Sequence, residues 1–131
     1  MSDALSRALV AGHADFAAGM ISAVEQITGQ GAVLVPIQVR DLCGDDIQKV
    51  LHDAMMKTGA RVIFTDLQAG SCTMAARRVL REIGEGVLVA GTNLPMLLDF
   101  ALSSNASAAE AAASAAERGR AAVIVHTGSP A

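Results

Sequence analysis

Short apolar runs alternate with stretches of helical periodicity along most of this 131-residue chain. Between the runs, apolar residues recur at helical spacing, as Phe16, Met20, Val24 and Ile27 do. This alternation predicts βαβ units, in which consecutive strands are parallel and joined by right-handed crossovers. We therefore expect an α/β fold with three layers, α/β/α, and a central, mainly parallel sheet of order 2-1-3-4. Its first four strands are expected at residues 7–12, 32–39, 61–65 and 86–91.

The last third of the chain predicts two further helices. Pro95 suits the first turn of a helix that runs to Leu102. Ser107, with Glu110 three residues later, forms a capping-box pattern at the start of an Ala-rich helix over residues 106–118. This segment has low complexity but high helix propensity, so we expect a surface helix and not a linker.

The chain closes on another apolar run, residues 121–127, which favours a C-terminal strand. Residues 128–131 are expected to be a flexible tail. We find no internal repeat and no composition shift that would mark a boundary. The prediction is one domain over residues 1–131, with a core over about 7–127.

Composition excludes several classes of function. Aromatic residues make up 2% of the chain, and the net charge is −3, so we expect no nucleic-acid binding by base stacking or phosphate contacts. No apolar run approaches the roughly 20 residues of a membrane-spanning helix. The first residues have no signal-peptide pattern, and two cysteines that form no close pair suit a reducing compartment. We expect a cytoplasmic protein.

Two polar residues follow neighbouring strands of the expected sheet. His13 comes after the first strand and Asp66 after the third, so a 2-1-3-4 order would place both at the switch point of the sheet. Histidine can carry a phosphoryl group transiently, and a carboxylate beside it can hold one tautomer. Gly70 and Ser71 could add backbone amides and a hydroxyl to form a phosphate cradle. Either residue alone could equally be an ordinary loop residue, His13 as a polar side chain and Asp66 as a turn cap.

Three segments resemble the mannose-family (mannose/fructose/sorbose and N-acetylgalactosamine type) IIA domains of the bacterial phosphoenolpyruvate-dependent sugar phosphotransferase system (PTS). Ala11-Gly12-His13 looks like the phosphohistidine segment of that family. Residues 64–71 look like its strand-Asp-Gly-Gly-Ser loop, and residues 89–98, Val-Ala-Gly-Thr-Asn-Leu-Pro-Met-Leu-Leu, like its Gly-x-Asn-hydrophobic-Pro-Met-Leu segment. The likeness extends over roughly residues 7–127.

The resemblance implies a function. Such domains accept phosphate from the phosphocarrier HPr and pass it to a IIB component, which phosphorylates sugar taken up by a membrane IIC/IID permease. His13 would be the phosphoryl acceptor, and Asp66 and Ser71 the orienting carboxylate and hydroxyl. From its own place in the sequence, Asn93 is expected to brace the loop after the fourth strand and could support the site. The resemblance also implies a homodimer in which the strand at residues 121–127 is exchanged between subunits.

The chain departs from the family pattern at several positions. Ala69 replaces the second glycine of the loop, and Ser71-Cys72-Thr73-Met74 replaces the usual Ser/Thr-Pro-Phe run. Asp15 adds negative charge two residues after His13, which would disfavour a bound phosphate if its side chain pointed inward.

Other functions stay open at this point. A regulatory phosphohistidine module, or a phosphotransfer subunit for a dihydroxyacetone kinase, would use the same residues. A nucleotide-binding or response-regulator-like protein is disfavoured, because no glycine-rich phosphate loop follows any strand. We expect no cofactor and no metal, since His13, His52 and His126 have no recognisable ligand spacing. Nothing in the motifs selects the sugar or the ring nitrogen that is modified.

Overall fold

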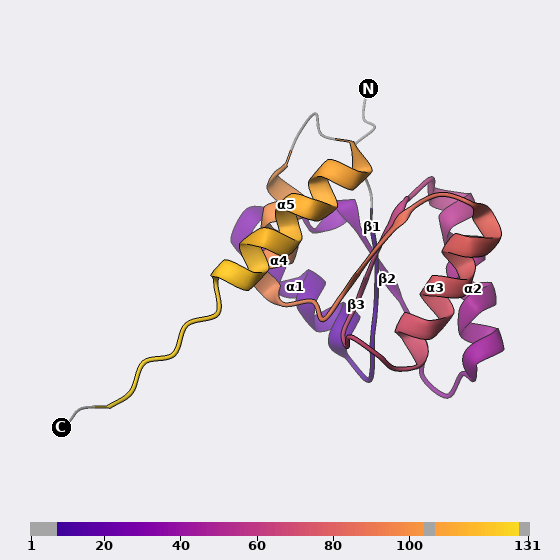
Figure 1. Cartoon of the computed structure of the whole chain (residues 1–131), viewed down its shortest axis with the longest axis horizontal. Helices are drawn as coiled ribbons and strands as arrows, with labels where there is room; N and C mark the ends of the chain where they lie inside the picture. Colours follow the sequence, from indigo (N-terminus) through magenta and orange to yellow (C-terminus); the bar gives the residue numbers. More distant parts are fainter. Residues whose placement is uncertain (1–7, 104–106, 129–131) are drawn as a thin grey trace.

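The computed structural model describes residues 8–103 and 107–128 and contains a central four-stranded sheet (Figure 1). All strand pairs are parallel, and the order is β2-β1-β3-β4, which confirms the predicted sheet. The strands are shorter than predicted, with bounds β1 (Ala8–Ala11), β2 (Leu34–Ile37), β3 (Val62–Thr65) and β4 (Val87–Ala90). The predicted second strand loses its beginning because Gly31–Val33 forms a 3₁₀ turn. Pro36, which lacks a backbone N–H, lies on the edge strand β2, where it is tolerated.

Helices cover both faces of the sheet, as predicted (Figure 1). Helix α5 opens with the predicted capping box, in which Ser107 and Glu110 bond each other's backbone N–H at 3.1 Å. No helix among the described residues is long and apolar enough to span a membrane. The helices are α1 (Phe16–Thr28), α2 (Gly44–Thr58), α3 (Ser71–Ile83), α4 (Leu94–Leu102) and α5 (Ala108–Ala121).

Alternate strand residues serve two separate cores. On one face, Val10 and Phe64 pack with residues of α1, α4 and α5. On the other, Leu9 and Ile63 pack with residues of α2 and α3. Both central strands are fully buried. Their near-continuous apolar sequence follows from this burial on two faces, and polar residues appear only where these strands end.

The predicted C-terminal strand is absent from the described residues. Ala121 is the last residue of α5, and residues 123–128 leave the body of the molecule without regular structure (Figure 1). Val123, Ile124 and Val125 are all exposed. A strand needs a neighbour to pair its backbone N–H and C=O groups. This segment finds no such neighbour within the described chain. The rest of the predicted tail, residues 129–131, lies outside the described residues.

Candidate functional site

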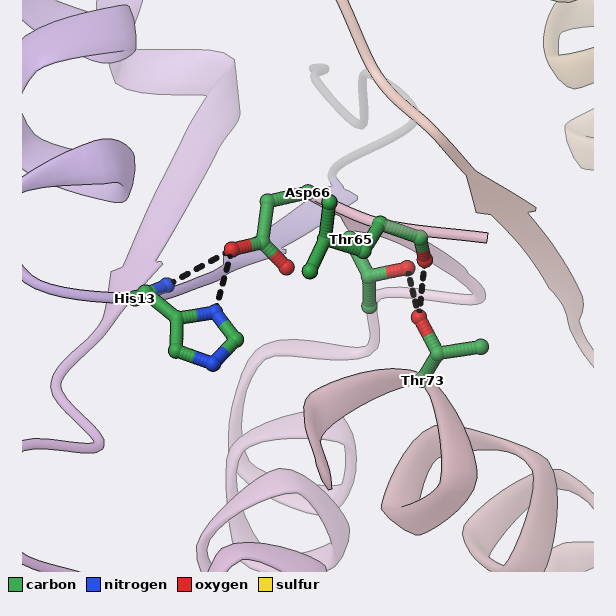
Figure 2. Close-up of polar contacts among 5 residues, drawn as sticks. His13, Thr65, Asp66 and Thr73 are labelled. Carbon is green, nitrogen blue, oxygen red and sulfur yellow. Dashed lines mark hydrogen bonds and ion pairs between the residues drawn. The ribbon is translucent and has the colours of Figure 1, made fainter. Parts of the chain in front are cut away.

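His13 and Asp66 meet at the carboxyl edge of the sheet. Strands β1 and β3 are paired in register, with Ala11 opposite Thr65, so the residues that follow them emerge side by side. One carboxylate oxygen of Asp66, Oδ2, accepts two hydrogen bonds from His13. The ring Nδ1 lies 2.7 Å from this oxygen, and the backbone N–H donates to it over 2.8 Å (Figure 2).

This contact determines the state of the imidazole. A charged carboxylate can only accept, so Nδ1 must carry the proton. In the neutral ring, the lone pair is then on Nε2, which Figure 2 shows on the side of the ring away from Asp66. The His13 side chain is 60% exposed, whereas that of Asp66 is 12% exposed. The imidazole ring is thus largely open to solvent, while the carboxylate that binds it is shielded.

The ionised form of Asp66 is favoured by its surroundings. Partial burial pushes the pKa of Asp66 upward, but the hydrogen bonds from the ring and backbone of His13, together with the charge of the ring, outweigh it. The net effect is a pKa below the usual value of 3.8. Asp66 therefore stays charged near neutral pH and can balance a positive imidazole ring.

Gly12 makes the close approach of Asp66 possible. A Cβ at this position would lie 2.5 Å from Cδ2 of Phe16 and 2.9 Å from Cγ of Asp66, and both are shorter than real contacts allow. Only a residue without a side chain lets the end of β1 pass between the phenyl ring and the carboxylate. In the sequence, Gly12 stands within the segment that resembles the family's phosphohistidine segment, but nothing there predicts this steric role.

The start of α3 lies next to the imidazole. Gly70 is the N-cap residue of α3, and a Cβ there would lie 3.9 Å from Cε1 of His13. Its φ of +138° and ψ of 174° fall in a region that essentially only glycine adopts. No side chain caps the helix at this position, and the exposed Ser71 is its first residue. The helix start, with its partial positive charge, therefore lies beside His13 and can receive an anion.

Two buried threonines brace the loop between Asp66 and α3. The hydroxyl of Thr73 donates to the carbonyl oxygen of Leu67 over 2.6 Å and lies 2.7 Å from the hydroxyl of Thr65 (Figure 2). Each hydroxyl has one proton, so Thr65 donates to Thr73, which donates to Leu67. This relay ties β3, the loop and α3 together. In the sequence, Thr73 stands out only within Ser71-Cys72-Thr73-Met74, which replaces the family's usual run, and no pattern marks Thr65.

Asn93, a candidate supporting residue of the site, makes its hydrogen bonds elsewhere. Asn93 caps α4 by accepting from the Met96 N–H over 3.2 Å, and it donates to the Gly119 carbonyl oxygen over 3.0 Å. These bonds join the loop after β4 to α4 and α5, and neither involves His13. Cys72 is buried, and burial, followed by the charge of Asp66, raises the pKa of its thiol. An unreactive thiol is the expected consequence.

No metal centre accompanies this site in the described part of the chain. Within residues 8–103 and 107–128, no group of three histidine, cysteine or carboxylate side chains is placed to hold an ion. His52 lies on α2 with Nδ1 3.7 Å from Oδ1 of Asp53, and His126 is exposed in the C-terminal segment.

The chain matches a family model and several solved structures. Residues 7–117 match the EIIA-man model, described as the PTS system fructose IIA component. The mannose/sorbose-specific IIA subunit of the phosphotransferase system from Enterococcus faecalis superposes with a TM-score of 0.80 at 21% identity, covering 98% of this chain and 99% of that one. Component EIIA from Streptococcus agalactiae superposes with a TM-score of 0.83 at 18% identity, covering 92% and 97%. No curated protein matches the chain significantly in sequence.

Replacing Gly12 by alanine tests the close approach at the end of β1. The added methyl group must displace Phe16 or Asp66, so we expect a loss of about 1–3 kcal/mol in the free energy of unfolding, measured with urea. Gly19→Ala is the matched control, because Gly19 lies on α1 with nothing near its Cβ position. This control should gain roughly 0.5–1 kcal/mol. If both substitutions changed the free energy of unfolding by the same amount, the close approach at Gly12 would not be the cause of the loss.

The lowered pKa of Asp66 predicts how stability changes in acid. The stabilising contribution of the carboxylate is complete above the unfolded-state pKa, near 3.8, and is lost as the pH falls through the lower folded-state pKa. Wild type should therefore exceed Asp66→Asn in free energy of unfolding at pH 7, and the gap should narrow below about pH 4. Urea titrations at several pH values measure the gap. A gap that stays constant down to pH 2 would refute this assignment.

Proposed function

The chain belongs to the EIIA-man family and is an EIIA component of the PTS, and on this basis we propose that it carries a phosphoryl group on Nε2 of His13. The donor in this proposal is phospho-HPr, and the acceptor is a IIB component that phosphorylates a sugar during uptake. The observation that carries the proposal is the double contact of Asp66 Oδ2 with the ring and backbone of His13. The protein would act in the cytoplasm and meet a IIC/IID permease only through IIB.

The transfer is an in-line displacement at phosphorus. The lone pair of Nε2 attacks, the bond from phosphorus to the donor imidazole breaks, and that imidazole leaves with the electron pair. His13 keeps its proton on Nδ1, so its ring becomes positive as the new bond forms, and the charged Asp66 balances it. The amides at the start of α3, beside Gly70 and Ser71, neutralise the phosphoryl oxygens. These steps use only residues of the two proteins.

Labelling from phosphoenolpyruvate tests the acceptor. With enzyme I and HPr, the wild-type protein should acquire an acid-labile phosphoryl group, and His13→Ala should acquire none, because it lacks the nucleophile. His52→Ala should label like wild type, since His52 lies on α2 away from the site. ³¹P–¹⁵N correlation spectra should place the phosphorus on Nε2. An unlabelled wild type, or a phosphoryl group on Nδ1, would refute the proposal.

The second half-reaction separates transport from regulation. Labelled protein that passes its phosphoryl group to a IIB component serves a sugar transporter. Labelled protein that transfers to no IIB component, but binds or modifies a regulator or a dihydroxyacetone kinase, serves signalling or that kinase instead.

We also propose a homodimer that exchanges the C-terminal segment. Strand β4 is an edge strand, and its backbone lines an open groove of about 420 Å³ together with α5. Residues 123–125, Val-Ile-Val, are exposed and have strong β propensity. The same segment of a second subunit could add to β4 as a fifth strand, which would cover both the open edge and these apolar side chains.

Removing residues 123–131 tests the exchange. The shortened protein should sediment as a monomer at concentrations where wild type sediments as a dimer, because the strand that joins the subunits is gone. His126→Ala is the matched control in the same segment and should stay dimeric, since the side chains that need cover are the apolar ones. A monomeric wild type, or a dimeric shortened protein, would contradict the proposal.

A further inference from the structure

Asp15 and Arg40 form an ion pair at the same edge of the sheet as His13. Asp15 follows β1 and Arg40 follows β2, and these strands are parallel neighbours. Nη2 of Arg40 donates to Oδ1 of Asp15 over 3.0 Å. Neither residue belongs to the three short segments that carry the family likeness, so that likeness assigns the pair no role.

The charge of Asp15 matters because of its distance along the chain. Cα atoms two positions apart are at most about 7 Å apart, and the Debye length is about 30 Å at an ionic strength of 0.01 M, so at low salt the Asp15 carboxylate lies within one Debye length of a group on the His13 ring whichever way the two side chains point. A phosphoryl group brings up to two negative charges. An unpaired Asp15 would therefore repel the phosphorylated form.

The orientation of Asp15 is unusual for its position. It is the N-cap residue of α1, where an aspartate usually accepts a hydrogen bond from the first helical amides. Here its side chain accepts none of them and bonds Arg40 instead. Ala14, between His13 and Asp15, has a left-handed φ of +48°, which sets the direction in which the chain enters the helix. The positive end of α1, directly after His13, is thus not capped by its own carboxylate.

We propose that Arg40 is a positioning residue for phosphotransfer, which neutralises Asp15 and holds its carboxylate off the α1 N-terminus. Without Arg40, Asp15 is free to cap α1 and stands as an unpaired charge two residues from the phosphoryl acceptor. This inference rests on the proposed function of His13 and adds an electrostatic control to the same site.

The pair is suited to this task and not to holding the fold together. The Arg40 and Asp15 side chains are 62% and 88% exposed, and exposed ion pairs contribute little to stability. Substitutions should therefore leave the thermal unfolding midpoint unchanged and alter the reaction of His13. If the pair instead served folding, substitutions would lower the thermal unfolding midpoint and leave the reaction of His13 unchanged.

A double-mutant cycle tests the proposal. We expect Arg40→Ala to slow phosphorylation of His13 about three- to tenfold at low salt, the effect of one nearby charge on a doubly charged group. The difference in phosphorylation rate between Arg40→Ala and wild type should become smaller at high salt, which screens the charge of Asp15. Asp15→Ala should react at least as fast as wild type, and the double variant should match Asp15→Ala. Lys49→Ala, an exposed cation on α2, controls for net charge and should react like wild type.

Phosphoramidate, a small donor, and phospho-HPr are used in parallel, which separates the chemistry at His13 from protein docking. A double variant as slow as Arg40→Ala with both donors would mean that Arg40 contacts the phosphoryl group directly, and would overturn the proposal. A deficit seen with phospho-HPr alone would overturn it too, since Arg40 would then bind the partner. Arg40→Ala that reacts like wild type would also overturn it. If the proposed function of His13 itself were wrong, the wild-type protein would not be labelled at all, and this result differs from every outcome named above.

Discussion

The site depends on the parallel pairing of β1 with β3. That register places the residues after the two strands within hydrogen-bonding distance, although His13 and Asp66 are 53 positions apart in sequence. A different strand order would separate them, and neither residue could then define the state of the other. The pairing also allows one carboxylate oxygen to bind both the backbone and the ring of His13, which limits the rotation of the imidazole as well as its tautomer.

Two features around the His13–Asp66 contact hold it in place: the missing side chain at Gly12 and the hydrogen bonds of two threonines. Gly12 lacks a side chain that would push Asp66 away, and the two buried threonines hold the following loop through their hydroxyl groups. Buried hydroxyl groups are costly unless they are bonded, so this relay fixes one loop conformation. The rigid parts of the site thus lie on the sheet and α3, while the imidazole ring of His13 stays exposed.

Much of this arrangement follows from the sequence, because the fold brings its strand ends together in a predictable way. Hydrophobic periodicity predicts the strands and helices, and the 2-1-3-4 order predicts that His13 and Asp66 meet, as the structure confirms. The three motif segments predict the family, and the match over residues 7–117 confirms it. The threonine relay and the Asp15–Arg40 pair could not be predicted, because side-chain direction depends on local backbone angles such as that of Ala14.

The C-terminal segment marks a different limit. Its apolar, β-branched residues at positions 121–127 are typical of a strand, although the structure shows no strand there. Periodicity reports what a segment prefers to bury, whereas a strand also requires a neighbour with free N–H and C=O groups. In a single described chain, β4 has an open edge and residues 123–125 are exposed. The edge of β4 offers unpaired backbone groups, and residues 123–125 offer an apolar segment that could pair with them. Helix α5 ends before this segment and directs it away from its own sheet (Figure 1). The strand that the sequence favours therefore lacks a neighbour within the described chain, and a second subunit is the neighbour that we propose.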